Sequence, residues 1–406
     1  MLIKLAWRNL WRNRKRSIIT LTSIAIAVLL AVSMRSMQLG MYDNMIKNVV
    51  GSYVGYIQIH GKGYWEEQTL DNALQITPQL RDKVQSIPGV KHLIERIGTF
   101  SLGSRGDETK GVMVSGIRME DERQMVDWDA RLLKGELLPP GSEDILLAKG
   151  VARFFRADVG DTMVLIGQGY HGMSAAGKFR VGGIVDMKNP KINSVSVFLS
   201  LPVAQDYLSA KNVVTHLVID KAENADEKQM LKRLTTALDT SKYEVMGWRE
   251  MLPELEQTIL ADSVGGLLMV FILYMIITFG IFGTVLMMTQ ERIFELGIMM
   301  AIGMKRLKLI LTLIYETIIL TILGLLIGIA LVLPIMYYYH VHPLQLGLDQ
   351  AEVMEKFGFE ATVPFLFNLQ LPLTHALIIF IISLVIALYP VIRIWRLNPL
   401  EAMRSK

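Results

Sequence analysis

Glu291-Arg-Ile-Phe-Glu-Leu-Gly-Ile-Met-Met-Ala-Ile-Gly-Met-Lys-Arg-Leu-Lys308 is a short charged segment between two long apolar runs. Residues 263–290 carry no charged side chain, and residues 309–339 carry one, Glu316. Each run is long enough to cross a hydrocarbon core of about 30 Å. The 18-residue segment between them is therefore predicted to be a connector at a membrane face.

The N-terminal region predicts a further span. Residues 1–16 hold six basic residues and no acidic one, with Trp7 and Trp11 four positions apart, as in an amphipathic helix at the headgroup level. Residues 17–34 are uncharged, and we expect a first span over 17–39. A cleaved signal peptide also begins this way, but the apolar run is long and no small-residue cleavage site follows it.

Composition agrees with a membrane protein that carries a large polar part. The chain has 406 residues, of which 51% are hydrophobic and 20% charged, whereas soluble domains carry about 25% charged residues. The net charge of +4 gives no reason to expect nucleic acid as a partner. The chain has no cysteine, which excludes disulfides, thiolate zinc sites and catalytic thiols.

Residues 40–262 alternate short β-like runs with turns and helical runs, which predicts a globular α+β domain. Strand–helix–strand patterns occur near both of its ends, and the middle, about 110–200, is rich in strands. We therefore expect two subdomains, a porter-like one and a β-rich one inserted into it. The last helix of the domain is expected to continue into the second span.

The remaining boundaries follow from hydropathy, and charge sets the orientation. The predicted segments are span two over 263–290, the connector over 291–308, span three over 309–337, an outer loop over 338–372, span four over 373–392 and a tail over 393–406. Segments 1–16, 291–308 and 393–406 carry fourteen lysines and arginines, whereas residues 340–372 carry one. The positive-inside rule then predicts cytoplasmic termini, a cytoplasmic connector and an extracytoplasmic domain.

Three residues in span three are candidates for a relay or packing role. Glu316 is a carboxylate inside a span, where charge is costly and functional by default. Either it pairs with Lys305, Arg306 or Arg393 in a structural or force-relay role, or it belongs to a proton path. Gly324 and Gly328 are spaced for close helix approach, within one chain or between two.

Two other motifs resemble functional sites but have simpler structural interpretations. Gly172-Met-Ser-Ala-Ala-Gly-Lys178 resembles a phosphate-binding loop but is followed by Phe179, so we interpret it as a glycine-rich hairpin turn. His340 and His342 could bind a metal with Glu352 or Glu355, but an interfacial histidine pair is the simpler interpretation. We predict no catalytic site, no metal and no cofactor.

The connector has acidic residues early and basic residues late, which would complement the dipole of a separate helix. Such a helix would either lie at the interface or dock into a cytoplasmic partner. Its sequence, from Glu291 to Arg306, resembles the hallmark connector of FtsX-like permeases, the MacB and lipoprotein-releasing LolC/LolE class of ABC transporters. Residues 5–16, 160–165, 179–186 and 398–404 resemble other parts of that family, so the likeness spans the chain. Residues 55–61 lean toward the lipoprotein-releasing branch.

The resemblance implies a mechanism. Such permeases have four spans and an external domain, pair as dimers of identical or paralogous subunits, and bind two cytoplasmic ATPase subunits that hydrolyse the ATP. The permease would then be a transport subunit of the bacterial inner membrane and not an enzyme. Its ATPase-coupling positions would be Glu291, Glu295, Gly297, Gly303, Lys305 and Arg306.

Two classes of function remain open on this reading. One is a transporter that extracts or expels a substrate or a substrate carrier, such as a lipoprotein, a peptide or a drug. The other is a transmitter that controls extracytoplasmic cell-wall hydrolases or sensing. The outer domain shows strands and no heptads, which favours transport.

Overall fold

The computed structural model describes residues 2–12, 14–222, 225–345, 347 and 362–396. These form two compact units. Of the described residues, the helical unit comprises those within 2–43, 258–345 and 362–396, and the sheet unit comprises those within 44–257 and residue 347.

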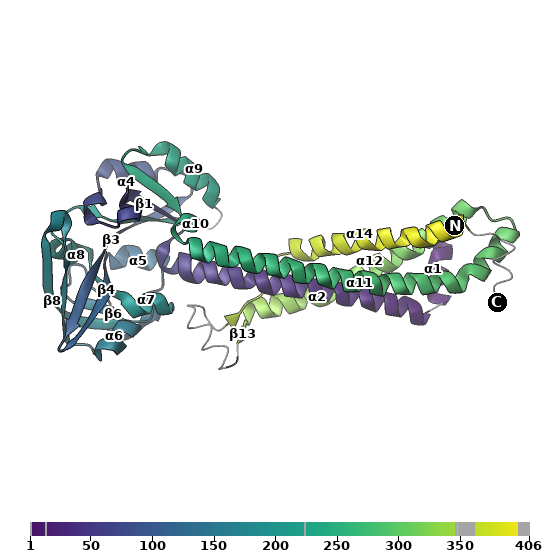
Figure 1. Cartoon of the computed structure of the whole chain (residues 1–406), viewed down its shortest axis with the longest axis horizontal. Coiled ribbons are helices and arrows are strands. Elements are labelled where there is room, and N and C mark those ends of the chain that lie inside the picture. Colours follow the sequence, from purple (N-terminus) through teal and green to yellow (C-terminus); the bar gives the residue numbers. More distant parts are fainter. Residues whose placement is uncertain (1, 13, 223–224, 346, 348–361, 397–406) are drawn as a thin grey trace. The chain divides into compact units, whose positions relative to one another are not determined.

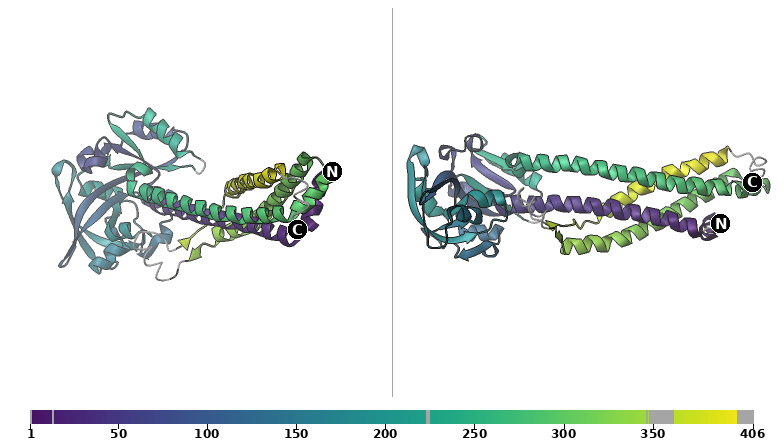
Figure 2. Two further views of the ribbon diagram at one scale, coloured as in Figure 1. Left: turned by 45° about the vertical axis from the view of Figure 1, so that its right-hand side comes forward. Right: turned by 60° about the horizontal axis from the view of Figure 1, so that its bottom comes forward.

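Four helices among the described residues are long and apolar enough to cross a membrane. They are α2 (Arg14–Ile46), α11 (Pro253–Ala301), α12 (Arg306–Val341) and α14 (Gln370–Trp395), and the amphipathic α1 (Leu2–Arg12) precedes them. In the helical unit the four long helices run side by side (Figures 1 and 2). The predicted spans all lie inside them.

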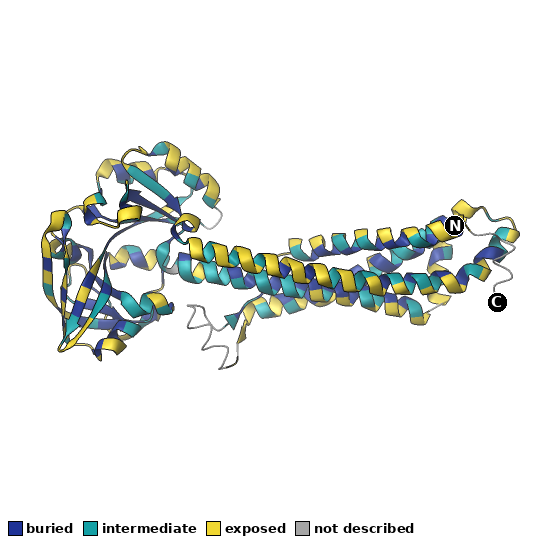
Figure 3. Ribbon diagram, viewed as in Figure 1, coloured by how far each residue is buried: buried dark blue, intermediate teal, exposed yellow. Residues whose placement is uncertain are grey.

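The bundle has an apolar interior and an apolar exterior. Buried residues from all four helices, including Ile24, Val28, Ile281, Val332 and Ile379, form its core. Exposed and buried residues alternate along these helices (Figure 3). Many of the exposed residues carry large apolar side chains. An apolar surface of this kind fits hydrocarbon rather than water.

The connector differs from the prediction, because residues 291–308 do not form an element of their own. Helix α11 continues through Glu291 to Ala301, and α12 begins at Arg306. Residues 290–301 contain no proline, and their one glycine, Gly297, lies inside α11 without ending it, so the helix continues almost to Gly303. The acidic residues therefore lie near the C-terminal end of α11. The prediction that their charges complement the dipole of a separate helix is wrong.

The other bounds also differ in detail. Residues 338–341 of the predicted outer loop belong to α12, and residues 393–395 of the predicted tail belong to α14. Two short strands, β13 (Leu344–Gln345) and β14 (Thr362–Val363), pair within the loop. Glu352, Glu355 and residues 397–406 lie outside the described residues.

The sheet unit is built around one ten-stranded mixed sheet in the order β12-β1-β11-β3-β4-β9-β6-β8-β5, with β7 pairing β3 and β8. Its strands are β1 (Ile57–Gly61), β3 (Val90–Arg105), β4 (Glu108–Ile117), β5 (Leu132–Gly135), β6 (Ile145–Ala148), β7 (Thr162–Gln168), β8 (Ser174–Val185), β9 (Ser196–Ser200), β11 (His216–Lys221) and β12 (Tyr243–Gly247). Strands β2 (Leu74–Gln75) and β10 (Val213–Val214) form a separate pair.

Short helices connect the strands. They are η1 (Lys47–Val54), α3 (Tyr64–Glu67), η2 (Leu70–Asn72), α4 (Pro78–Gln85), α5 (Met119–Met125), η3 (Asp129–Arg131), α6 (Lys149–Phe155), η4 (Tyr170–Gly172), α7 (Pro190–Val195), α8 (Leu201–Tyr207), α9 (Glu227–Ala237) and α10 (Trp248–Met251). Side-chain caps start several of them: Thr77 accepts from Leu80 N at 3.2 Å before α4, and Asp226 accepts from Lys228 N at 2.9 Å before α9.

Two regions of the sheet bury separate cores. One comes from both ends of the domain, where Ile57 and Ile59 of β1 and Leu217 of β11 pack on α4 and α9. The other comes mainly from the middle and buries two clusters, one around Val114, Leu147 and Val197 and one around Trp128, Leu146 and Phe198. Strand β3 joins the two regions, because it pairs with β11 over its first half and with β4 and β7 over its second. The sheet thus continues across the predicted edge of the inserted subdomain at residue 110.

Candidate functional site

The strongest polar feature of the helical unit is a buried ion pair between Arg292 of α11 and Glu316 of α12. The side chains are 8% and 3% exposed, and Arg292 Nη1 donates to Glu316 Oε2. Arg292 Nη2 also donates to the backbone oxygen of Asn9 in α1, at 3.4 Å. A buried charge is stable only when it is paired and hydrogen-bonded, so this contact holds α1, α11 and α12 together.

The prediction that Glu316 pairs with Lys305, Arg306 or Arg393 is wrong. Arg292 takes that place because α11 and α12 are antiparallel and joined by a tight turn. Residues equally far from the turn on the two helices then face each other, and Arg292 and Glu316 are equally far from Met304.

Two further ion pairs join the same end of α11 to the N-terminal helices. Arg12 of α1 pairs with Glu295, and Arg16 of α2 pairs with Glu291. These pairs are partly exposed, so each is expected to contribute less than about 1 kcal/mol to stability. We call the set Asn9, Arg12, Arg16, Glu291, Arg292, Glu295 and Glu316 the inner latch. Two of the predicted coupling residues, Glu291 and Glu295, therefore already have partners within the chain.

The turn between α11 and α12 is closed by a glycine. Gly303 has φ +99°, a conformation that favours glycine, and its N–H donates to Met300 O at 3.0 Å. Met304 N donates to Met299 O, also at 3.0 Å, which completes a Schellman motif. Ile302 beside it is 81% exposed. This exposed turn is the part of the predicted connector that is open to a partner.

The other predicted coupling residues lie in different surroundings. Lys305 precedes α12 and is exposed. Arg306 Nη1 donates to the backbone oxygen of Trp395 at the end of α14, at 3.0 Å. Gly297 is buried within α11. Gly297 therefore packs inside the bundle, and its coupling role stays a prediction.

Gly324 and Gly328 serve packing between α12 and α2. A Cβ on Gly324 would lie 2.8 Å from Cβ of Ile24, and one on Gly328 would lie 2.8 Å from Cβ of Val28. Such distances are too short for side chains, so the two glycines let the helices touch. Of the two alternatives left open by the sequence, the structure shows the contact within one chain.

A second set of contacts joins α2 to α11 near the opposite end of the helices, and sequence reasoning missed it. Gln38 Nε2 donates to the backbone oxygen of Asp262 at 3.0 Å, and Tyr42 donates its hydroxyl hydrogen to the Asp262 carboxylate at 2.5 Å. Arg35 donates to Gln38 Oε1 at 2.6 Å. We call Arg35, Gln38, Tyr42 and Asp262 the outer latch. Its only sequence signal is polar residues at the edges of two apolar runs.

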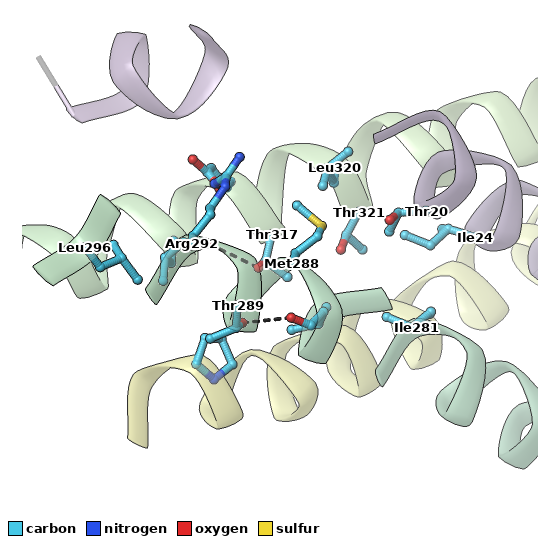
Figure 4. Close-up of a pocket in the computed structure, with 14 residues that line it drawn as sticks. Thr20, Ile24, Ile281, Met288, Thr289, Arg292, Leu296, Thr317, Leu320 and Thr321 are labelled. Carbon is cyan, nitrogen blue, oxygen red and sulfur yellow. Dashed lines mark hydrogen bonds and ion pairs between the residues drawn. The ribbon is translucent and has the colours of Figure 1, made fainter. Parts of the chain in front are cut away.

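A small cavity lies beside the buried ion pair, between α2, α11, α12 and α14 (Figure 4). Thr20, Thr289, Thr317 and Thr321 are among its lining residues. Its volume is about 30 Å³, which is room for little more than one water molecule. The cavity can therefore hold a water molecule, but it has no room for a substrate.

The remaining motifs do not form sites with the inner latch. Residues 174–178 belong to β8, so the predicted glycine-rich turn covers only the end of the β7–β8 connection. His340 contacts the backbone oxygen of Phe365 at 2.9 Å, and His342 stacks on Tyr338 with ring centroids 5.0 Å apart. Among the described residues, no group of three or more histidine, aspartate or glutamate side chains is placed to hold a metal.

Comparisons with known proteins agree with this architecture. The model of the MacB-like periplasmic core domain matches residues 17–237, and that of the FtsX-like permease C-terminal region matches residues 267–399. The chain belongs to the FtsX-like permeases with a MacB-like periplasmic core. The permease is thus a membrane protein with an extracytoplasmic domain, of the kind that serves ABC transporters.

Individual relatives are more distant. The permease is 27% identical over 159 residues to the lipoprotein-releasing system transmembrane protein LolC of Neisseria meningitidis serogroup B, a match over 38% of this chain and 36% of LolC. The periplasmic region of MacB from Actinobacillus actinomycetemcomitans matches 52% of this chain and 95% of its own, at 13% identity and a TM-score of 0.35. The extracellular domain of the transporter YknZ from Gram-positive bacteria matches 48% and 100%, at 13% identity and a TM-score of 0.34.

Proposed function

We propose that the permease carries movement from the α11–α12 turn to the extracytoplasmic domain. The observation that carries this proposal is that α2 and α11 are joined at two places, by the inner latch and by the outer latch. These two helices are also the ones that lead into and out of the sheet unit along the chain. Helices joined in this way move as a pair, so a displacement at one end reaches the other.

The source of the movement is a cytoplasmic ABC ATPase dimer that docks on the α11–α12 turn. The turn offers two large exposed apolar side chains, Ile302 and Leu307, next to the exposed Lys305. Apolar anchors with a charged rim are typical of a protein-binding surface. Gly303, Lys305 and Arg306 are the coupling residues on this turn, and Glu291 and Glu295 act behind it, through the inner latch.

A second permease subunit, identical or paralogous, packs on the exposed face of α11. Many large apolar side chains along this helix are exposed, among them Leu267, Leu268, Phe271, Ile276 and Phe279. In one subunit this face would meet only lipid. Dimer formation would cover it and set two turns in place for two ATPase subunits.

The substrate class is proposed from the LolC match and the character of the sheet unit. LolC belongs to a lipoprotein-releasing system, and the described part of the outer domain is a sheet with short helices. This favours extraction of a lipoprotein, or efflux of a peptide or drug, over control of a cell-wall hydrolase through coiled coils.

Co-purification from native membranes tests the function. We expect an ABC ATPase and an outer-membrane lipoprotein or its carrier to elute with the permease. A cell-wall hydrolase in place of the lipoprotein would support the regulatory alternative. Recovery of the permease without any ATPase, under conditions that preserve other ABC complexes, would contradict the proposal.

A further inference from the structure

Helix α1 has an exposed face that the described residues of the chain leave uncovered. Two stripes of side chains, each with members four positions apart, run along this face. The apolar stripe is Ile3, Trp7 and Trp11, and the basic stripe is Lys4, Arg8 and Arg12. The side chains of the apolar stripe are 44–59% exposed. Large apolar groups on one side of a helix normally pack on a protein core or on lipid, so this stripe needs a partner outside the chain.

The opposite face of α1 is held against the bundle. Ala6 and Leu10 are buried, and the backbone oxygen of Asn9 accepts a hydrogen bond from Arg292 of the inner latch. These contacts fix the rotation of α1 about its own axis. The apolar stripe is therefore held facing away from the helices on which α1 packs.

The place of α1 in the chain puts this face at the surface of the membrane. Only residue 13 separates α1 from α2, the first of the long apolar helices. Ser17 of α2 donates a hydrogen bond to the backbone oxygen of Leu10, at 2.8 Å. In one straight helix these two residues would lie about 10 Å apart along the axis, so the chain turns sharply between α1 and α2. α1 therefore leaves the direction of the spanning helix where that helix begins, at the level of the lipid headgroups.

The charges of this region indicate which lipids lie against it. Lys4 and Arg8 are exposed, and so are Arg14 and Lys15 at the start of α2. Among the described residues, none of these four side chains forms an ion pair, and residues 1–16 contain no acidic residue. Basic side chains near a membrane surface attract anionic headgroups, and tryptophan prefers the headgroup level. Both stripes thus fit the same partner, an anionic lipid surface.

We propose that α1 binds anionic lipids. The two unpaired cations of the basic stripe, Lys4 and Arg8, contact the lipid phosphate groups, and the apolar stripe inserts among the adjoining acyl chains. The buried side of α1 belongs to the inner latch, so the bound lipids lie one helix away from Arg292. The lipid site does not depend on the proposed movement, because binding requires only the exposed face of α1 and the membrane.

The test uses the full chain in nanodiscs made of equal parts phosphatidylglycerol and phosphatidylcholine, with bromine on the acyl chains of one lipid or the other. Bromine quenches the fluorescence of tryptophans nearby. Trp395→Phe serves as the background, because it removes another exposed tryptophan of the helical unit. The quenching that disappears on adding Trp7→Phe and Trp11→Phe then reports on α1. We expect brominated phosphatidylglycerol to quench this signal about threefold more than brominated phosphatidylcholine, because the cations attract the anionic lipid.

Lys4→Gln/Arg8→Gln changes only exposed side chains, so the fold should be kept, and the two brominated lipids should then quench equally. Lys305→Gln/Lys308→Gln is the matched control, since it removes two exposed cations outside α1 and should leave the preference as it is.

Three results would overturn the proposal. Absence of quenching by either lipid would assign the apolar stripe to a protein partner. Equal quenching by the two lipids in the Trp395→Phe chain would mean that α1 meets lipid without selecting its charge. A preference that survives Lys4→Gln/Arg8→Gln, or that both double variants reduce equally, would show that the basic stripe does not bind the lipid.

Discussion

At the scale of single residues, the Arg292–Glu316 pair is a place in the helical unit where loss of one partner is costly. Glu316→Leu would leave the Arg292 guanidinium buried without its counter-ion, which costs about 3–5 kcal/mol. We expect a large loss of thermal stability in detergent. The double variant Arg292→Met/Glu316→Leu should recover most of it, because two apolar groups remove the buried charge.

Glu295→Leu is the matched control for this prediction, since Glu295 also pairs with an arginine but is about half exposed. Its effect on stability should stay below about 1 kcal/mol. Similar losses from Glu316→Leu and Glu295→Leu would mean that burial does not set the strength of these pairs.

His60 makes the sheet unit sensitive to acid. Burial lowers its pKa from 6.5 to about 4, and its neighbours in the sheet are Glu244 on β12 and His216 on β11. Between these two pKa values, the His60 imidazole binds a proton in the unfolded chain but not in the folded chain. The contribution of His60 is fully present above pH 6.5 and falls as the pH drops toward 4, by about 3 kcal/mol in total.

Amide hydrogen exchange in β1 and β11, measured between pH 7 and 4 and corrected for the intrinsic rate, reports this loss. His60→Phe keeps an aromatic ring beside Tyr64 and should reduce the slope of stability against pH. Part of the slope should remain, because the pKa of His216 is also lowered. His171→Phe removes a histidine that is mostly exposed and should leave the slope as it is. An unchanged slope in His60→Phe would assign the acid sensitivity to other groups.

At the scale of elements, the α11–α12 turn and the inner latch have separable effects. Gly303→Pro removes the N–H that bonds Met300 and fixes φ near −65°, so the Schellman motif cannot form. We expect transport to uncouple from ATP hydrolysis while the sheet unit stays folded. Asparagine tolerates a positive φ better than most other non-glycine residues, so Gly303→Asn should keep most of the coupling.

The inner latch can be tested by exchanging its charges. Glu295→Lys places a second cation beside Arg12 and should reduce the coupling of transport to ATP hydrolysis. Stability should change little, because the pair is exposed. Arg12→Glu combined with Glu295→Lys restores opposite charges and should restore transport. If the double variant transports no better than Glu295→Lys, the Arg12–Glu295 contact does not carry the movement.

The elements also show which parts of the structure a sequence can predict. The four long helices follow from apolar runs such as 263–290, because a helix satisfies every backbone hydrogen bond within one segment in lipid. Strand β3 lies mostly before the strand-rich middle that the sequence predicts, and it carries Glu95 and Arg96, whose burial depends on partners from other segments. The Arg292–Glu316 pair was missed for a related reason: it depends on the position of one turn, and the sequence suggested a longer connector.

At the scale of the whole molecule, the proposed function requires the α11–α12 turn and the sheet unit to lie on opposite sides of the membrane. The chain has no native cysteine, so single cysteines can report this without background. Lys305 and Lys4 are exposed in the helical unit, and Met173 is exposed in the sheet unit. With a membrane-impermeant maleimide on spheroplasts, Met173→Cys should react at once. Lys305→Cys and Lys4→Cys should react only after the membrane is opened, because the basic segments around them favour the cytoplasm. Reaction of Lys305→Cys and Met173→Cys from the same side would remove the basis for any transfer of movement across the bilayer.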